Sequence, residues 1–189
     1  MRWFATLLLL AAPLAAQNVR VRMETQLGMI EIDVDAVHAP VTAANFMKYV
    51  DGGLYDGGAF HRTVKPDNQP ANKIRIQVVQ AGINPEKRGQ EVAPVALERT
   101  SQTGLKHLDG VISMARSGPD TATSDFFICI GDQPSLDFGG MRNPDGQGFA
   151  AFGRVVQGMD VVRKIQQAPA EGQNLKPPVG IVTARRAGR

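Results

Sequence analysis

The sequence contains a single cysteine, Cys129, so no disulfide can form within the chain. Cys129 lies in the apolar run 126–130, which predicts a buried, inert thiol rather than a reactive one. In an oxidising compartment, that burial would also protect the thiol. The sequence therefore excludes a disulfide scaffold and gives no support to cysteine chemistry.

Motifs for metal binding, hydrolysis and nucleotide binding are also missing. The three histidines, His38, His61 and His107, lie far apart and lack metal-ligand spacing, so we expect no metal and no cofactor. A secreted hydrolase is disfavoured because no Gly-x-Ser-x-Gly turn occurs, and 110–113 is predicted to be part of a strand. The glycines of 146–148 lie in a turn without nucleotide-binding spacing.

The basic residues do not form a cluster in the sequence, although the formal net charge is +3 and the pI is about 9.2. Lysines and arginines are interleaved with acidic residues, and no basic run alternates with aromatic residues. Single-strand binders need that combination, so we expect no nucleic-acid partner. Arg185, Arg186 and Arg189 are interpreted as a solvated terminus.

The apolar run near the start of the chain, 3–12, is shorter than the ~20 residues that a membrane span requires. It follows the positive charge of Arg2 and precedes the small residues 13–16, an order typical of a secretory signal peptide cut near Ala16. A membrane anchor is the less favoured alternative. We therefore predict a signal peptide at 1–16, export, and no stable membrane insertion.

The rest of the chain is predicted to form one domain over 19–186, since no repeat, low-complexity block or linker interrupts it. The 20 glycines and 12 prolines indicate many turns and argue against a helical bundle. Alternating apolar residues predict two strands within 19–35, joined by a hairpin at 26–28. A helix should run from Pro40 to the glycines at 52–53, with one apolar face formed by Ala43, Phe46, Met47 and Val50.

Short apolar runs separated by Gly, Pro, Asn and Asp predict further strands, at 59–63, 74–81, 110–115, 126–130, 150–156 and 180–184. A second helix is predicted at 159–167. Many short strands with two helices favour a closed antiparallel β-barrel with a helix over each end.

Five segments of the sequence resemble, in order, the signature blocks of the cyclophilin family of peptidyl-prolyl cis/trans isomerases. They are Phe60-His61-Arg62, Gln80-Ala81-Gly82, Ile112-Ser113-Met114-Ala115, Ser124-Asp125-Phe126-Phe127-Ile128 and Phe152-Gly153-Arg154-Val155. The resemblance covers nearly all of 19–186, and the predicted signal peptide indicates the exported bacterial type. It implies an eight-stranded antiparallel barrel with two capping helices, and catalysis of rotation about X-Pro bonds.

The resemblance also implies roles for individual residues. Arg62 is expected to be catalytic, as a fixed donor toward the proline nitrogen in the twisted state. Gln80 would hold Arg62 or the substrate backbone, and His61 would line the rim. The pocket for the proline ring is expected to consist of Val78, Phe127, Leu136 and Phe149. Ala115 and Arg116 should lie on a strand edge that pairs with the backbone of the bound peptide. Asp125 is also expected to bind substrate.

The sequence departs from the family pattern beside this site. Segment 65–72 is a longer, turn-rich loop that would gate or extend the groove. Gln77 stands where an aromatic pocket wall is usual, with Ile76 or the loop as the candidate replacement. Ser135 occupies a position that is tryptophan in some members, which predicts weak cyclosporin binding. Asp125 replaces a usual glutamine, and Ala81 a usual glycine.

The function we expect is isomerisation of X-Pro bonds during the folding of exported proteins, with proline-containing unfolded or extended polypeptides as partners. The alternative is a binding module or chaperone with the same fold and little turnover, which Gln77 mildly favours and Arg62, Gln80 and Phe127 disfavour. A monomer in the periplasm is the expected state.

Overall fold

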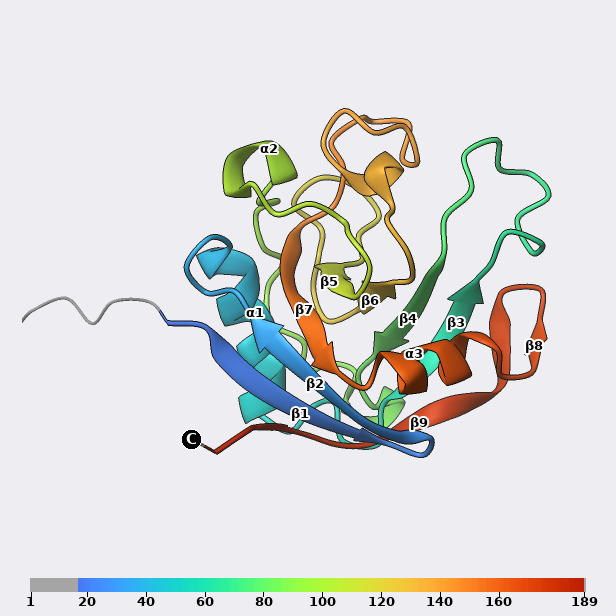
Figure 1. Cartoon of the computed structure of the whole chain (residues 1–189). Coiled ribbons are helices and arrows are strands. Elements are labelled where there is room, and N and C mark those ends of the chain that lie inside the picture. Colours follow the sequence, from blue (N-terminus) through green and yellow to red (C-terminus); the bar gives the residue numbers. More distant parts are fainter. Residues whose placement is uncertain (1–16, 189) are drawn as a thin grey trace, which may run out of the picture.

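The computed structural model describes residues 17–188, so the predicted signal peptide at 1–16 lies outside the described residues. The elements, in chain order, are β1 (Val19–Thr25), β2 (Gly28–Val34), α1 (Pro40–Asp51), β3 (Ala59–Val64), β4 (Val78–Gly82), a 3-10 turn (Pro85–Lys87), α2 (Thr100–Thr103), β5 (Val111–Met114), β6 (Phe126–Cys129), a 3-10 turn (Pro134–Leu136), β7 (Ala151–Gln157), α3 (Met159–Gln166), β8 (Ala170–Glu171) and β9 (Asn174–Arg186). Figure 1 shows their arrangement.

Within residues 17–188, eight strands close into an antiparallel barrel in the order β1-β2-β7-β5-β6-β4-β3-β9. The long strand β9 completes the circle, because its first half pairs with β3 and its second half pairs with β1. Among the described strands, the two-residue β8 pairs only with β9. The predicted closed eight-stranded barrel is therefore confirmed.

Side-chain alternation along the strands separates the barrel interior from its outer face. On β6, Phe126 and Ile128 belong to the main core, whereas Phe127 and Cys129 belong to a second, smaller apolar cluster. The same split occurs on β4, where Val79 and Ala81 point into the core and Val78 joins the second cluster. The outer face of these strands thus carries its own apolar surface.

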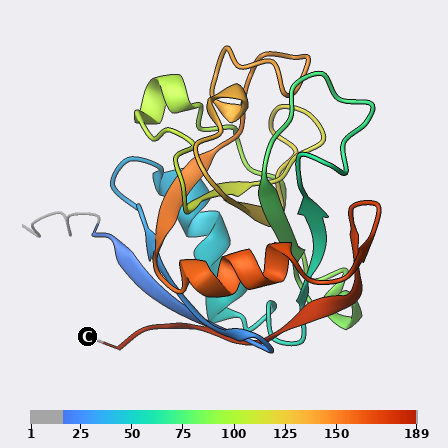
Figure 2. The ribbon, with the colours of Figure 1, turned by 45° about the vertical axis from the view of Figure 1, so that its right-hand side comes forward.

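Helices α1 and α3 match the two predicted helices and lie on opposite sides of the barrel (Figures 1 and 2). The four-residue α2 was not predicted. The first turn of α1 has no side-chain cap of its own, and Glu98 supplies one by accepting hydrogen bonds from the backbone N–H groups of Val41 and Thr42 at 3.1 and 2.7 Å. No helix within 17–188 has the length and hydropathy of a membrane span.

Two predicted strand boundaries are wrong. The strand predicted at 74–81 begins only at Val78, because side chains rather than a strand partner hold the backbone of Ile74 and Ile76. The last strand begins at Asn174 instead of 180, since Pro177 and Pro178 interrupt the apolar pattern there without ending the strand. The long loops 65–77 and 130–150 gather at one end of the barrel in both views (Figures 1 and 2).

Candidate active site

The candidate site lies on the outer face of β3, β4 and β6. The second apolar cluster forms its floor and consists of Val64, Ile76, Val78, Phe127, Cys129 and Leu136, with Ala115 and Phe149 packed against it. Strand alternation places these residues outside the barrel while their neighbours in sequence fill the core. An apolar surface on one side of a barrel wall is a suitable floor for a ligand.

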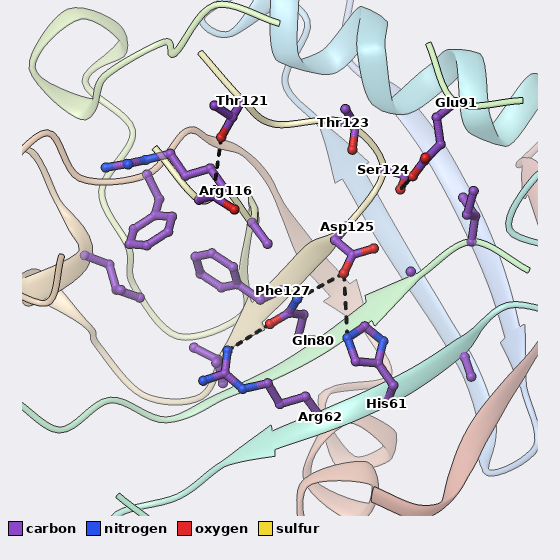
Figure 3. A pocket seen from close by; sticks show the side chains of 18 of the residues that line it. His61, Arg62, Gln80, Glu91, Arg116, Thr121, Thr123, Ser124, Asp125 and Phe127 are labelled. Atoms are coloured by element: carbon purple, nitrogen blue, oxygen red, sulfur yellow. Dashed lines mark hydrogen bonds and ion pairs between the residues drawn. The ribbon is translucent and has the colours of Figure 1, made fainter. Parts of the chain in front are cut away.

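A β-bulge on β3 brings two consecutive polar side chains to this face. Phe60 pairs with Ala81 and points into the barrel, and Arg62 pairs with Gln80, so His61 is the extra residue between two register positions. Bulges of this kind re-aim side chains next to functional sites. Here the bulge lets both His61 and Arg62 face the cavity, as Figure 3 shows.

A chain of polar contacts crosses the site from Arg62 to His61 (Figure 3). Arg62 Nη1 donates to Gln80 Oε1 at 3.1 Å, and Gln80 Nε2 donates to Asp125 Oδ2 at 3.1 Å. His61 Nε2 lies 3.6 Å from the same Asp125 oxygen, and the side chains of His61 and Asp125 are each 41% exposed. The contacts run from the interior of the site to its solvent rim.

A cavity of about 780 Å³ opens above these residues. It is lined by all ten residues named from the sequence: His61, Arg62, Val78, Gln80, Ala115, Arg116, Asp125, Phe127, Leu136 and Phe149. These residues come from three strands and from the loops after β5 and before β7. The fold therefore brings the predicted site residues to one cavity, although it does not by itself assign their roles.

The side chain of Arg116 supports the cavity wall from behind. It is only 1% exposed and pairs with Asp145 through Nη1 at 2.7 Å. Its Nε also donates to Gly148 O at 2.8 Å, and its guanidinium carbon lies 4.9 Å from the centre of the Phe149 ring. Phe149 in turn meets Phe127 edge to face, with ring centres 5.4 Å apart. Arg116 thus fixes an aromatic wall.

The expected strand edge at Ala115 and Arg116 is not present in that form. Strand β5 ends at Met114, and the backbone N–H of Ala115 already donates to Asp125 O at 2.9 Å. Because the chain leaves the sheet here, both residues line the cavity from a loop instead of a strand.

Ile76 provides the wall that Gln77 does not. Ile76 is 7% exposed and lines the cavity within the second apolar cluster. The Gln77 side chain turns toward α3, where its Oε1 accepts from Gln166 Nε2 at 3.4 Å. An aliphatic residue from the segment just before β4 therefore stands beside Val78 in place of an aromatic one.

Four arginines, Arg62, Arg88, Arg116 and Arg142, line the cavity against two acidic residues, Glu91 and Asp125, so positive charge is in excess there. Burial lowers the pKa of the Arg62 guanidinium, but arginine stays charged in proteins. Arg142 also lines the cavity, and its pKa is lowered by burial and by the neighbouring charge of Arg62. Within 17–188, no three His, Cys, Asp or Glu side chains gather as a metal site would require.

Sequence reasoning missed two residues that shape the site, Arg142 and Gln173. Arg142 donates through Nη1 to Ile74 O at 2.6 Å and so ties the loop before β7 to the loop before β4. Gln173 accepts hydrogen bonds from Arg62 although the two residues are 111 positions apart. No periodicity or motif marks either residue, because their roles arise only from the folded arrangement of loops.

The chain is similar in sequence to one protein family and to individual proteins that carry the same activity in their names. The family described as "Cyclophilin type peptidyl-prolyl cis-trans isomerase/CLD" matches residues 20–186. A peptidyl-prolyl cis-trans isomerase of Acinetobacter baylyi is 34% identical over 183 residues, covering 94% of this chain and 90% of that protein. Peptidyl-prolyl cis-trans isomerase A of Dickeya dadantii is 39% identical over 158 residues, covering 83% and 76%.

Solved structures show the same fold. A cyclophilin-type isomerase of Cryptosporidium parvum superposes with a TM-score of 0.72 at 20% identity, covering 92% of this chain and 99% of that chain. A second structure of that type from the same organism, solved in the presence of the dipeptide Ala-Pro, gives a TM-score of 0.71 at 20% identity, with coverage of 90% and 99%.

Proposed function

This chain belongs to the cyclophilin-type peptidyl-prolyl cis-trans isomerases, and on that premise we propose that Arg62 is the residue that accelerates X-Pro rotation in the cavity described above. Members of this family act on proline-containing peptides. The observation that carries the proposal is that a charged, anchored guanidinium and an apolar floor line one cavity.

The reaction needs no bond to break and no proton to move. Partial double-bond character gives the X-Pro bond a rotation barrier of about 18–20 kcal/mol, so uncatalysed exchange takes tens to hundreds of seconds. A catalyst accelerates exchange only by binding the twisted state more tightly than either planar state. In the twisted state the proline nitrogen is pyramidal and carries a lone pair, which a fixed donor would stabilise selectively.

Arg62 has the properties required of such a donor. Its charge is permanent, and its planar N–H groups are held by hydrogen bonds to other side chains. Figure 3 shows the guanidinium on the side of the cavity that carries the Phe127 ring. A proline ring seated on Phe127 and Leu136 would exclude water from the reacting bond, so the charge would act in a medium of low polarity.

The other cavity residues would bind the peptide around that bond. Gln80 would keep Arg62 in place, and His61 and Asp125 would meet substrate residues at the rim. Val78 and Phe149 would complete the ring pocket, with Arg116 supporting Phe149 from behind. Ala115 lines the same wall.

The test is a proline-limited refolding assay with the wild type and Arg62→Ala. Loss of one charge-assisted donor costs roughly 1.5–3 kcal/mol, which corresponds to about a ten- to hundredfold loss of kcat/KM. Arg154→Ala removes an exposed arginine on β7 and should keep full activity. Equal rates for the wild type and Arg62→Ala would instead favour the binding module with little turnover.

We further propose that the enzyme is exported and assists the folding of exported proteins as a monomer. The support is the order of charge, apolar run and small residues at 1–16. After cell fractionation, the protein should be found outside the cytoplasm, and N-terminal sequencing should show that the mature chain begins near Gln17. Analytical ultracentrifugation of the purified protein should give the mass of one chain. A cytoplasmic chain that retains Met1 would contradict export.

A further inference from the structure

The turn between β8 and β9 holds the edge of the Arg62 guanidinium that faces away from Gln80. We propose that Gln173, in this turn, is a positioning residue that sets the plane of Arg62 for catalysis; this inference rests on the catalytic role proposed for Arg62. Gln173 acts through Arg62 and is not itself assigned a contact with substrate.

The contact is a forked one. Gln173 Oε1 accepts from Arg62 Nε at 2.9 Å and from Arg62 Nη2 at 2.6 Å. Two N–H groups of a rigid plane that converge on one oxygen restrain rotation of the guanidinium far more than a single bond does. With the bond from Nη1 to Gln80, the guanidinium is fixed on two sides.

Some N–H groups of the Arg62 guanidinium remain available to the substrate. A guanidinium has five N–H groups, one on Nε and two on each Nη nitrogen. Gln173 and Gln80 occupy three of them, one on each nitrogen. One N–H on Nη1 and one on Nη2 have no other hydrogen-bond partner within residues 17–188. The two glutamines therefore select which N–H groups of Arg62 can meet a proline nitrogen.

Gln173 is itself held in the orientation that this role requires. Its backbone O accepts from Thr63 N at 2.8 Å, and its side-chain Nε2 donates to Asn68 O at 3.1 Å. A flipped amide would place its NH2 group against the cationic Arg62 and its oxygen against the Asn68 carbonyl. The environment thus permits one orientation, with the oxygen toward Arg62.

Asn68 links this arrangement to the long loop 65–72. Its side chain accepts from Lys65 N at 2.7 Å and donates to Thr63 O and Gly172 O, each at 3.0 Å. Asn68 therefore ties the loop both to β3, which carries Arg62, and to the turn that carries Gln173. The loop then contributes to catalysis by fixing the position of the Asn68 carbonyl.

This role predicts an effect on kcat rather than on substrate affinity. Without the oxygen of Gln173, the half-buried Arg62 would lose one acceptor and the two hydrogen bonds made to it, and the guanidinium would rotate toward water. The floor formed by Phe127 and Leu136 would stay intact, so the peptide would still bind. A purely structural role for Gln173 would lower stability without changing the state of Arg62.

The experiment compares Gln173→Met, which keeps the length of the side chain but has no acceptor of comparable strength, with Gln173→Glu, which keeps the acceptor. Gln157→Met, at the exposed end of β7, is the matched control. We expect Gln173→Met to lower kcat about tenfold with KM within about twofold, as expected for a misplaced charge-assisted donor. Gln173→Glu keeps the acceptor toward Arg62 but loses the donor to Asn68 O, so it should lose less kcat than Gln173→Met, and Gln157→Met should match the wild type.

Two further readouts separate positioning from folding. In NMR spectra of the wild type, the Arg62 Nε–H should exchange slowly with water, and Gln173→Met should accelerate that exchange. In an Arg62→Ala background, Gln173→Met should cause no further loss of kcat. An unprotected Arg62 Nε–H in the wild type would overturn the proposal without any variant.

The outcomes distinguish this inference from the proposed function. If Arg62→Ala is impaired and Gln173→Met is as active as the wild type, Gln173 has no positioning role and the function of Arg62 stands. If Gln173→Met loses the same activity with and without Arg62, the loss is structural and the inference fails. If Arg62→Ala is fully active, both proposals fail.

Discussion

The side-chain amide of Gln69 forms hydrogen bonds with both backbone groups of Ile76. Its Nε2 donates to Ile76 O at 2.7 Å, and its Oε1 accepts from Ile76 N at 3.2 Å. Nε2 also donates to Lys65 O at 2.7 Å, and Gln69 is 1% exposed. A single side chain thus replaces a strand partner for Ile76 and holds this residue in the cavity wall.

Replacing Gln69 should damage both stability and substrate binding. Gln69→Ala leaves buried backbone groups of Ile76 and Lys65 without partners, which should cost about 2–4 kcal/mol of the free energy of unfolding. KM should rise, because Ile76 is no longer fixed beside Val78. Denaturant titration and steady-state kinetics measure the two effects, with Gln167→Ala, at the exposed end of α3, as control. A loss below about 0.5 kcal/mol, within the usual range of surface substitutions, would contradict this account.

The support that Arg116 gives to Phe149 should appear in KM. Arg116→Met removes the guanidinium that stacks on the ring and bonds to Gly148 O and Asp145. We expect KM to rise about three- to tenfold, as a loss of roughly 1 kcal/mol of binding implies. Asp145→Asn leaves the bonds to Gly148 in place and should have a smaller effect. If kcat falls instead while KM is unchanged, Arg116 acts on the reaction itself.

Acid should loosen the closure of the barrel at β9. The hydrogen bond from Arg185 lowers the pKa of Asp56 below its ordinary 3.8, although burial opposes the shift. Because the folded-state pKa is the lower one, this contribution to stability is complete above about pH 5 and is lost as the pH falls below 3.8.

The contribution of Asp56 is tested by measuring the free energy of unfolding of Asp56→Asn and the wild type at several pH values. The variant should be less stable than the wild type at neutral pH, and the difference should shrink as the pH falls below 3.8. Asp67→Asn, in the exposed part of the long loop, is the control. A constant difference across the range would show that Asp56 does not act through its charge.

The sequence patterns predict the strands of the barrel more accurately than they predict the contacts made by the loops. Alternation on β4 and β6 assigns Val79 and Phe126 to the core and Val78 and Phe127 to the outer face, because each strand has one face buried in the barrel. The family resemblance then named ten residues that the fold brings to one cavity.

The loop contacts could not be predicted, for a physical reason. Gln69, Asn68 and Gln173 act through amide hydrogen bonds to backbone groups and side chains that the fold brings together. Amide side chains have no hydropathy signal, and turn-rich segments have no periodicity, so these contacts leave no trace in the sequence. The start of β4 was misplaced for the same reason, since Gln69 holds Ile76 outside the sheet.

Ser135 should make cyclosporin bind weakly to the enzyme. The residue lies directly before Leu136 of the cavity floor and lacks the ring that some family members place at this position. An aromatic ring contributes apolar contact area that serine cannot supply. Ser135→Trp should therefore bind the inhibitor at least about tenfold more tightly than the wild type, measured by inhibition of isomerisation. Tight inhibition of the wild type would contradict the prediction.

The central claim is that Arg62 increases the rate of rotation about a bound X-Pro bond and contributes little to the affinity for the peptide. NMR exchange spectroscopy at equilibrium, on an Ala-Pro peptide with saturating enzyme, measures the cis/trans interconversion rate separately from affinity. We predict that Arg62→Ala lowers that rate at least about tenfold and leaves the dissociation constant within about threefold. An unchanged interconversion rate in Arg62→Ala, with the peptide bound as in the wild type, would contradict the account.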